Sequence, residues 1–170
     1  IVCANLCRFS GNSSYLASIG VMKIYLDTCC LNRPFDNQAD PRIHLETEAI
    51  KTIISWCEQG KYQLLTSEVL QLEIRKTPDL LRQKYLNLLL TPATENILIS
   101  TDIIQKAKDF EQAGIKAFDA LHLACATFRA DILLTVDDKF LKKALTINQS
   151  KLRVANPLKW LEEVLYDFYS

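Results

Sequence analysis

Short continuous apolar segments alternate with longer segments of helical spacing along most of this chain, and this alternation limits the fold more than any other feature. The apolar segments are rich in β-branched and aromatic residues and predict strands at residues 23–26, 62–66, 96–100, 131–135 and 151–155. The segments between them predict helices, and one of them begins at Asp40-Pro41 and ends at Gly60. Apolar strands that alternate with helices are typical of a parallel sheet covered on both faces. The sequence therefore predicts an α/β protein.

The chain is predicted to form one domain. Its 170 residues contain no internal repeat and no low-complexity tract. The only methionine is Met22, and residues 1–21 are rich in small and polar side chains with a single charge, Arg8. We expect residues 1–21 to be an extension ahead of a natural start at Met22, and residues 22–170 to be the domain.

Charge and cysteine content exclude several classes of protein. The chain has 20 Lys+Arg and 20 Asp+Glu, so it cannot hold nucleic acid by its overall charge, and any such contact must be local. The longest apolar runs fall short of the roughly 18 residues that cross a bilayer, so we expect no membrane partner. The six cysteines form no CxxC pair, which favours reduced thiols and a cytoplasmic location.

Four acidic residues occupy positions where a parallel sheet places functional groups. Asp27 ends the first predicted strand, and Asp137 follows the fourth. Glu73 and Asp119 lie in the helices next to that edge. Clustered carboxylates cannot all stay ionised at neutral pH without a cation. An all-oxygen ligand set suits Mg²⁺ or Mn²⁺, which can activate water and polarise a phosphodiester.

Each acid also has an ordinary structural interpretation. Asp137 can cap the helix that follows it, and Asp27 can simply end a strand. His122 lies three residues after Asp119, and we expect it to pack near the sheet rather than to bind a metal. The residues alone therefore leave both a metal site and four separate structural roles open.

Four segments of the chain resemble the PIN-domain nucleases, in the order and with the separations usual in that family. They are Leu26-Asp27-Thr28, Ser67 through Glu73, Phe118 through Ala124, and Leu134 through Phe140. The most specific parts are the Asp119-Ala120 pair followed by Ala124, and the T-x-D-x-x-F run at residues 135–140. Among PIN proteins the chain looks most like stand-alone VapC-type toxins.

The resemblance implies a three-layer α/β/α sandwich with a mainly parallel central sheet. It implies an acidic quartet as the catalytic set, supported by the hydroxyls of two threonines: Asp27, Glu73, Asp119 and Asp137, with Thr28 and Thr135. Asp27, Asp119 and Asp137 are expected to contact Mg²⁺ or Mn²⁺, directly or through water. Glu73 is expected to hold a metal-bound water or a second ion. The implied reaction is hydrolysis of RNA phosphodiesters to 5′-phosphate and 3′-hydroxyl ends.

The segment after Asp27 departs from the generic family pattern and is expected to be an unusual loop, at residues 29–36. Within it, Arg33 is a candidate RNA contact, although a role in anchoring the loop is equally open. Lys139, in a basic stretch after Asp137, is a second candidate RNA contact.

We therefore expect a metal-dependent endoribonuclease that is the toxin of a toxin–antitoxin pair. Its expected partners are RNA, a cognate antitoxin and a second copy of the chain. The alternative is a PIN-like scaffold that binds RNA or protein without cutting. A flavodoxin-like phosphoryl-transfer domain fits poorly, because Asp27 is followed by Thr28 and the last strand does not end in lysine.

Overall fold

A five-stranded parallel sheet forms the centre of the molecule. The computed structural model describes residues 20–147 and 151–169. In these residues the strands run in the order β3-β2-β1-β4-β5, and every neighbouring pair is parallel. Their bounds are Lys23–Leu26 for β1, Gln63–Ser67 for β2, Ala93–Ile97 for β3, Ile132–Leu134 for β4 and Arg153–Ala155 for β5.

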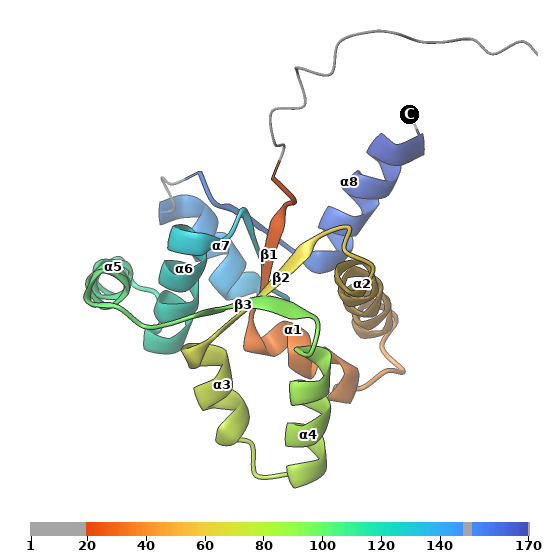
Figure 1. The fold of residues 1–170 in the computed structure, drawn as a ribbon, viewed down its shortest axis with the longest axis horizontal. Coiled ribbons are helices and arrows are strands. Elements are labelled where there is room, and N and C mark those ends of the chain that lie inside the picture. Colours follow the sequence, from red (N-terminus) through yellow and green to blue (C-terminus); the bar gives the residue numbers. More distant parts are fainter. Residues whose placement is uncertain (1–19, 148–150, 170) are drawn as a thin grey trace, which may run out of the picture.

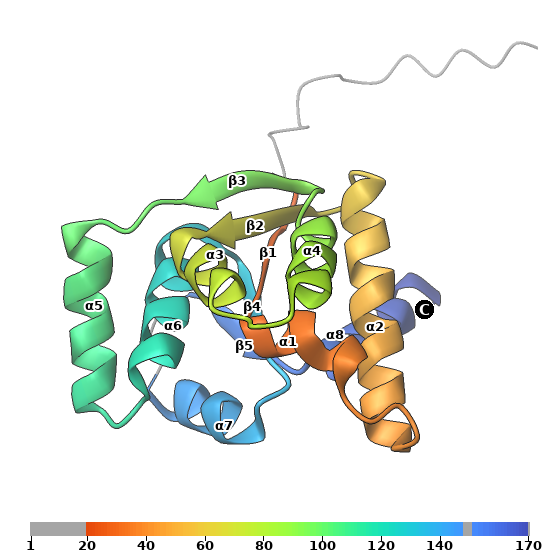
Figure 2. The same cartoon turned by 90° about the horizontal axis from the view of Figure 1, so that it is seen from below.

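Helices cover both faces of the sheet (Figures 1 and 2), with α2 and α8 on one side and α5, α6 and α7 on the other. The shorter α1, α3 and α4 lie beyond the carboxyl ends of the strands. The helices are α1 Thr28–Asn32, the 3₁₀ helix η1 Arg33–Phe35, α2 Pro41–Glu58, α3 Glu68–Arg75, α4 Leu80–Leu89, α5 Thr101–Gln112, α6 Ala117–Arg129, α7 Asp138–Ile147 and α8 Pro157–Tyr169. The predicted α/β/α sandwich is confirmed.

The core lies on both sides of the three inner strands. Ile24, Tyr25 and Leu26 of β1 have no exposed surface, and neither have Leu64 and Leu65 of β2. Side chains alternate between the two faces of a strand, so a strand buried on both faces must be apolar throughout. This is why each inner strand contains a short apolar run, at Ile24–Leu26, Leu64–Leu65 and Ile132–Leu134.

The third strand begins and ends earlier than predicted. The prediction of 96–100 followed the apolar run that ends at Ile99, whereas β3 spans Ala93–Ile97. β3 is an edge strand, and its side chains alternate between covered and exposed positions. Leu98, taken as part of the strand, is 65% exposed, and Ser100 rather than Thr101 caps α5. An edge strand is not buried on both faces, so hydrophobicity alone misplaces it.

The prediction of a loop after Asp27 was wrong, because residues 28–35 form α1 and η1.

The four cysteines from Cys29 onward are unpaired thiols, in agreement with the prediction. The expected extension, apart from its last two residues, lies outside the described part of the chain. None of the helices that the structure describes has both the length and the hydrophobicity needed to span a membrane.

Candidate active site

Two aspartates cap helices at the carboxyl edge of the sheet. Asp27 follows β1 and is 4% exposed, and its Oδ1 accepts a hydrogen bond from the backbone N–H of Cys30 at 3.0 Å. Asp137 directly precedes α7, and its Oδ1 accepts from the N–H groups of Lys139 and Phe140 at 2.8 and 3.0 Å. Asp137 therefore has the capping role that the sequence left open, and Asp27 both ends a strand and caps α1. Their positions at neighbouring strand ends bring them together.

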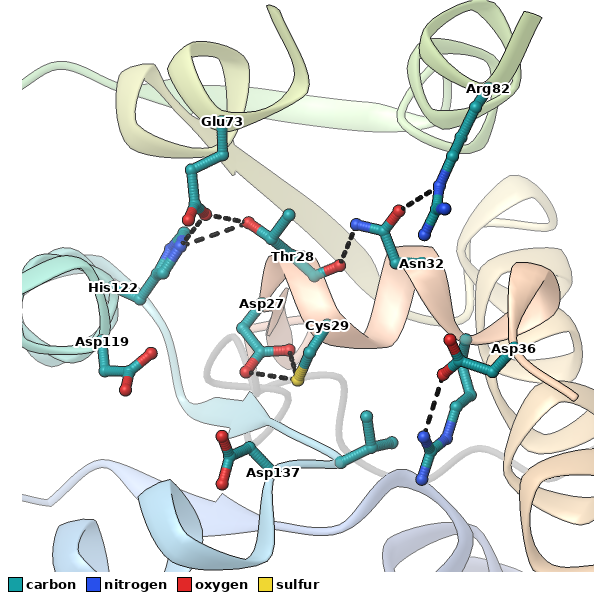
Figure 3. Close-up of a pocket in the computed structure, with 12 residues that line it drawn as sticks. Asp27, Thr28, Cys29, Asn32, Asp36, Glu73, Arg82, Asp119, His122 and Asp137 are labelled. Carbon is teal, nitrogen blue, oxygen red and sulfur yellow. Dashed lines mark hydrogen bonds and ion pairs between the residues drawn. The ribbon is translucent and has the colours of Figure 1, made fainter. Parts of the chain in front are cut away.

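The other two acids reach the same place from helices. Glu73 lies near the end of α3, and Asp119 lies in the first turn of α6. All four carboxylates line one pocket of about 410 Å³ (Figure 3), together with Thr28 and other polar residues. Asp27, Asp119 and Asp137 point toward one another in this view, and Glu73 lies slightly apart.

Asp119 carries an electrostatic penalty. Burial raises the pKa of its carboxyl, and the negative charges of Asp137 and Asp27 raise it further. Within the described residues its carboxylate makes no hydrogen bond or ion pair, and neither Asp27 nor Asp137 has an ion-pair partner there. Repulsion among three carboxylates is what a divalent cation relieves, and carboxylate oxygens are the ligands that Mg²⁺ and Mn²⁺ prefer. The chemistry of the three carboxylates suits such an ion.

Glu73 is held in the opposite electrostatic state. Burial would raise the pKa of its carboxyl, but the hydrogen bonds from His122 and Thr28, with the nearby charge of Lys76, lower the pKa overall. His122 Nε2 lies 2.6 Å from Glu73 Oε2, and the Thr28 hydroxyl donates to the same oxygen. Glu73 is therefore an ionised carboxylate at neutral pH, and its Oε1 makes no hydrogen bond to any residue that the structure describes.

A buried hydrogen-bond chain supports this carboxylate from behind. Tyr25 Oη lies 2.6 Å from Ser67 Oγ and 2.7 Å from Nδ1 of His122. One assignment of protons satisfies the whole chain: Ser67 donates to Tyr25, Tyr25 donates to Nδ1, and the Nε2 proton goes to Glu73. Burial raises the pKa of Tyr25 well above its ordinary value, so its hydroxyl stays protonated. His122 thus orients Glu73 rather than serving as a metal ligand.

The thiols near Asp27 do not replace the acids as ligands for a hard ion. Ligand atoms of Asp27, Cys29 and Cys30 lie within 4.8 Å of one another. Cys30 is buried and donates to the carbonyl of Leu134, and burial raises its pKa well above the ordinary value. Cys29 donates to both oxygens of Asp27, at 2.9 and 3.0 Å, and approaches the Thr135 hydroxyl at 3.4 Å. Thr135 also accepts from the N–H of Asp137 at 3.1 Å.

The two candidate RNA contacts lie at the margins of the acid cluster. Arg33 lines the pocket, but its guanidinium already forms ion pairs with Glu46 and Asp36. Lys139 lies beside Asp119 and Asp137 in a smaller neighbouring pocket of about 100 Å³. Whether either residue contacts RNA stays a prediction.

Two pocket residues were missed by the sequence analysis. Arg82 of α4 and Asn32 of α1 line the pocket and are hydrogen-bonded to each other at 2.8 Å. Arg82 lies in a segment that reads as an ordinary helix surface, so no local signal marks it. Asn32 lies in the segment that departs from the family pattern, and that departure was the one available signal.

Comparison with known proteins agrees with this geometry. The family model described as PIN domain matches residues 24–145, which is more than half of the chain and includes all four acids. PIN domains are generally nucleases and typically use divalent metal ions. No curated protein matches the chain. The parallel sheet, the acids gathered at its carboxyl edge and the extent of the match together show that this chain belongs to the PIN-domain family.

Proposed function

We propose that this protein is a metal-dependent endoribonuclease that hydrolyses phosphodiester bonds of RNA. The observation that carries the proposal is the convergence of Asp27, Asp119 and Asp137 in one pocket without a cationic partner among the described residues. A structural role would pair these acids with arginine or lysine. Their repulsion instead favours a site that a divalent ion completes.

The proposed roles follow from the positions of the side chains. Asp27, Asp119 and Asp137 would hold Mg²⁺ or Mn²⁺, and such an ion supplies activation of water and polarisation of the phosphate when bound. Each capping aspartate uses Oδ1 for its helix, which fixes the carboxylate. Oδ2 of Asp137 makes no hydrogen bond to a described residue, whereas Oδ2 of Asp27 also accepts from the Cys29 thiol at 3.0 Å. Glu73 Oε1 would accept a hydrogen bond from a water in the pocket, and His122 and Thr28 hold that carboxylate in place.

Cleavage of RNA tests the proposal directly. Purified protein should cut single-stranded RNA when Mg²⁺ or Mn²⁺ is added and should stop when the metal is chelated. Asp27→Asn or Asp119→Asn should abolish cleavage while circular dichroism shows an intact fold. Full activity in either variant would refute the mechanism. Absence of Mg²⁺ and Mn²⁺ binding at millimolar concentration would favour the non-catalytic scaffold.

We further propose that the nuclease is a toxin restrained by an antitoxin protein. Three leucines of α4 are exposed, Leu80 at 70%, Leu81 at 77% and Leu88 at 63%. Exposed apolar side chains on one helix support a protein partner or a second copy of the chain.

The unpaired thiols support a reducing, cytoplasmic location. Expression of the chain alone should arrest growth, and Asp119→Asn should remove the arrest. Light scattering distinguishes monomer from homodimer.

A further inference from the structure

We propose that Arg82 binds a backbone phosphate of the substrate strand next to the phosphodiester that is cut. The inference rests on the proposed nuclease function and names a substrate contact within the same pocket. It assigns this role to an arginine of α4 rather than to Arg33, the candidate that the sequence indicated.

The pocket has two sides of opposite charge. Figure 3 shows Asp119, Asp27 and Asp137 on one side and Arg82 across the pocket from them. A strand of nucleic acid carries one negative charge on every phosphate, so a purely acidic pocket would repel all of them. A metal ion at the acids can accept one phosphate. The phosphates on either side of it need a cation that belongs to the protein.

Two arginines line this pocket, and their partners differ. Arg33 is neutralised by Glu46 and Asp36, which both lie within ion-pair distance of its guanidinium. Arg82 forms no ion pair with any residue in the described ranges. Of the two, Arg82 therefore has a charge that no carboxylate of residues 20–147 or 151–169 compensates within ion-pair distance.

The guanidinium of Arg82 is held at a defined place by neutral groups. Its Nε donates to Asn32 Oδ1 at 2.8 Å, and its Cζ lies 4.7 Å from the centre of the Phe35 ring. Asn32 in turn donates to the carbonyl of Thr28 at 2.9 Å, in the short helix that Asp27 caps. Arg82 is thereby tied to the same segment as a proposed metal ligand, which sets its position relative to the site of cleavage.

The part of the guanidinium that remains available suits a phosphate. The Nε–H is used by Asn32, and the N–H groups of both Nη atoms make no hydrogen bond to a described residue. A planar fork of N–H donors matches two phosphate oxygens. Orientation by a neutral amide and an aromatic ring leaves the full positive charge for the ligand.

The experiment measures RNA binding rather than cleavage. In an Asp119→Asn background, fluorescence anisotropy follows a short labelled single-stranded RNA across a range of salt concentrations. Arg82→Gln should weaken binding about tenfold, because a charge-assisted hydrogen bond is lost. The plot of log K against log salt should also become less steep by about 0.7, the value for one phosphate contact on a single strand. Arg82→Lys should keep the slope and lose part of the affinity.

Arg75→Gln is the matched control, because Arg75 lies at the end of the neighbouring α3, is exposed, and does not line the pocket. It removes the same charge from the protein and should leave the slope unchanged. Thermal unfolding verifies that each variant is folded. If the parent binds RNA and Arg82→Gln behaves like Arg75→Gln, the inference fails while the nuclease proposal stands. If wild-type protein neither binds nor cuts RNA, the proposed function fails as well.

Discussion

Two regions of this molecule each contain a buried carboxylate, Glu46 in one and Asp27 in the other, and the groups around them differ. Glu46 of α2 is 1% exposed and accepts hydrogen bonds from Arg33 Nε at 2.7 Å, Arg42 Nε at 2.9 Å and Asn156 Nδ2 at 2.8 Å. Its charge is compensated by two arginines of the chain. In the pocket, Asp27 and Asp119 have no cationic partner within ion-pair distance in the described residues.

This difference supports a structural role for Glu46 and, under the proposed function, a metal-binding role for the pocket aspartates. Glu46 joins α2 to η1 and to the connection between β5 and α8, so every one of its partners is another part of the fold. The pocket acids converge on one another, and folding alone leaves their mutual repulsion in place. A buried acid whose charge the chain itself compensates contributes to the fold, whereas a cluster of aspartates without a cationic partner among the described residues is a candidate site for a ligand.

The largest expected effect is on catalysis. Asp119→Asn should lower the rate of RNA cleavage at least about a thousandfold, because a metal ligand contributes several kcal/mol to the transition state. Glu46→Gln should leave the catalytic rate of the folded fraction within a few-fold of wild type. The check is the initial rate of RNA cleavage by both variants, corrected for the fraction folded. A similar loss of cleavage rate in both variants would contradict a functional difference between the two regions.

The second-largest expected effect is on stability, and it concerns the region around Glu46. Glu46→Ala leaves Arg33, which is only 17% exposed, without its main partner. Removing one member of a buried ion pair costs about 3–5 kcal/mol of unfolding free energy. Urea unfolding followed by circular dichroism measures it. Asp119→Asn should cost nothing or stabilise the metal-free protein, and a loss below about 1 kcal/mol for Glu46→Ala would contradict the structural role.

A divalent ion should stabilise the protein through the pocket aspartates and not through the region around Glu46. At about 100 times its Kd, Mg²⁺ or Mn²⁺ should raise the unfolding free energy of the wild type by about 2.7 kcal/mol. The gain should vanish in Asp119→Asn and persist in Glu46→Gln. Differential scanning fluorimetry with metal or with chelator measures both. Equal gains in the two variants would place the ion outside the pocket.

The smallest expected effect is on the pH dependence of stability, which should have opposite signs for Asp119 and Glu73. The pKa of Asp119 is raised, so its ionisation disfavours the metal-free folded state. Wild type should therefore lose stability relative to Asp119→Asn as pH rises above about 4 and through the raised pKa of the folded state. The pKa of Glu73 is lowered, so its contribution is present above about pH 4.5 and is lost as pH falls through the folded value. Urea unfolding with chelator should show opposite trends for Asp119→Asn and Glu73→Gln.

Much of the fold could be predicted from the sequence because the inner strands are buried on both faces. β1, β2 and β4 appear as apolar runs and were placed to within a residue at each end. β3 was misplaced because an edge strand alternates. The short α1 was missed because its five residues contain no helical period, and the cap from Asp27 and contacts with other segments determine its conformation.

The four acids could be found because strand ends and family motifs mark them. What the sequence could not provide is the pairing between distant segments. His122 and Glu73 are 49 residues apart, and Arg82 and Asn32 are 50 apart. Each of these residues looks ordinary in its own helix. The folded topology alone decides that one pair supports a carboxylate and the other holds a guanidinium.

The position of β1 between β2 and β4 has a consequence for the timing of protein synthesis. Asp27 leaves the ribosome well before its neighbour at the sheet edge, Asp137, which follows β4. A nascent or truncated chain that ends before Ile132 contains at most three of the acids and lacks both β4 and Asp137. On the nuclease assignment, the messenger and the ribosome are exposed to no complete catalytic centre until translation has passed that strand.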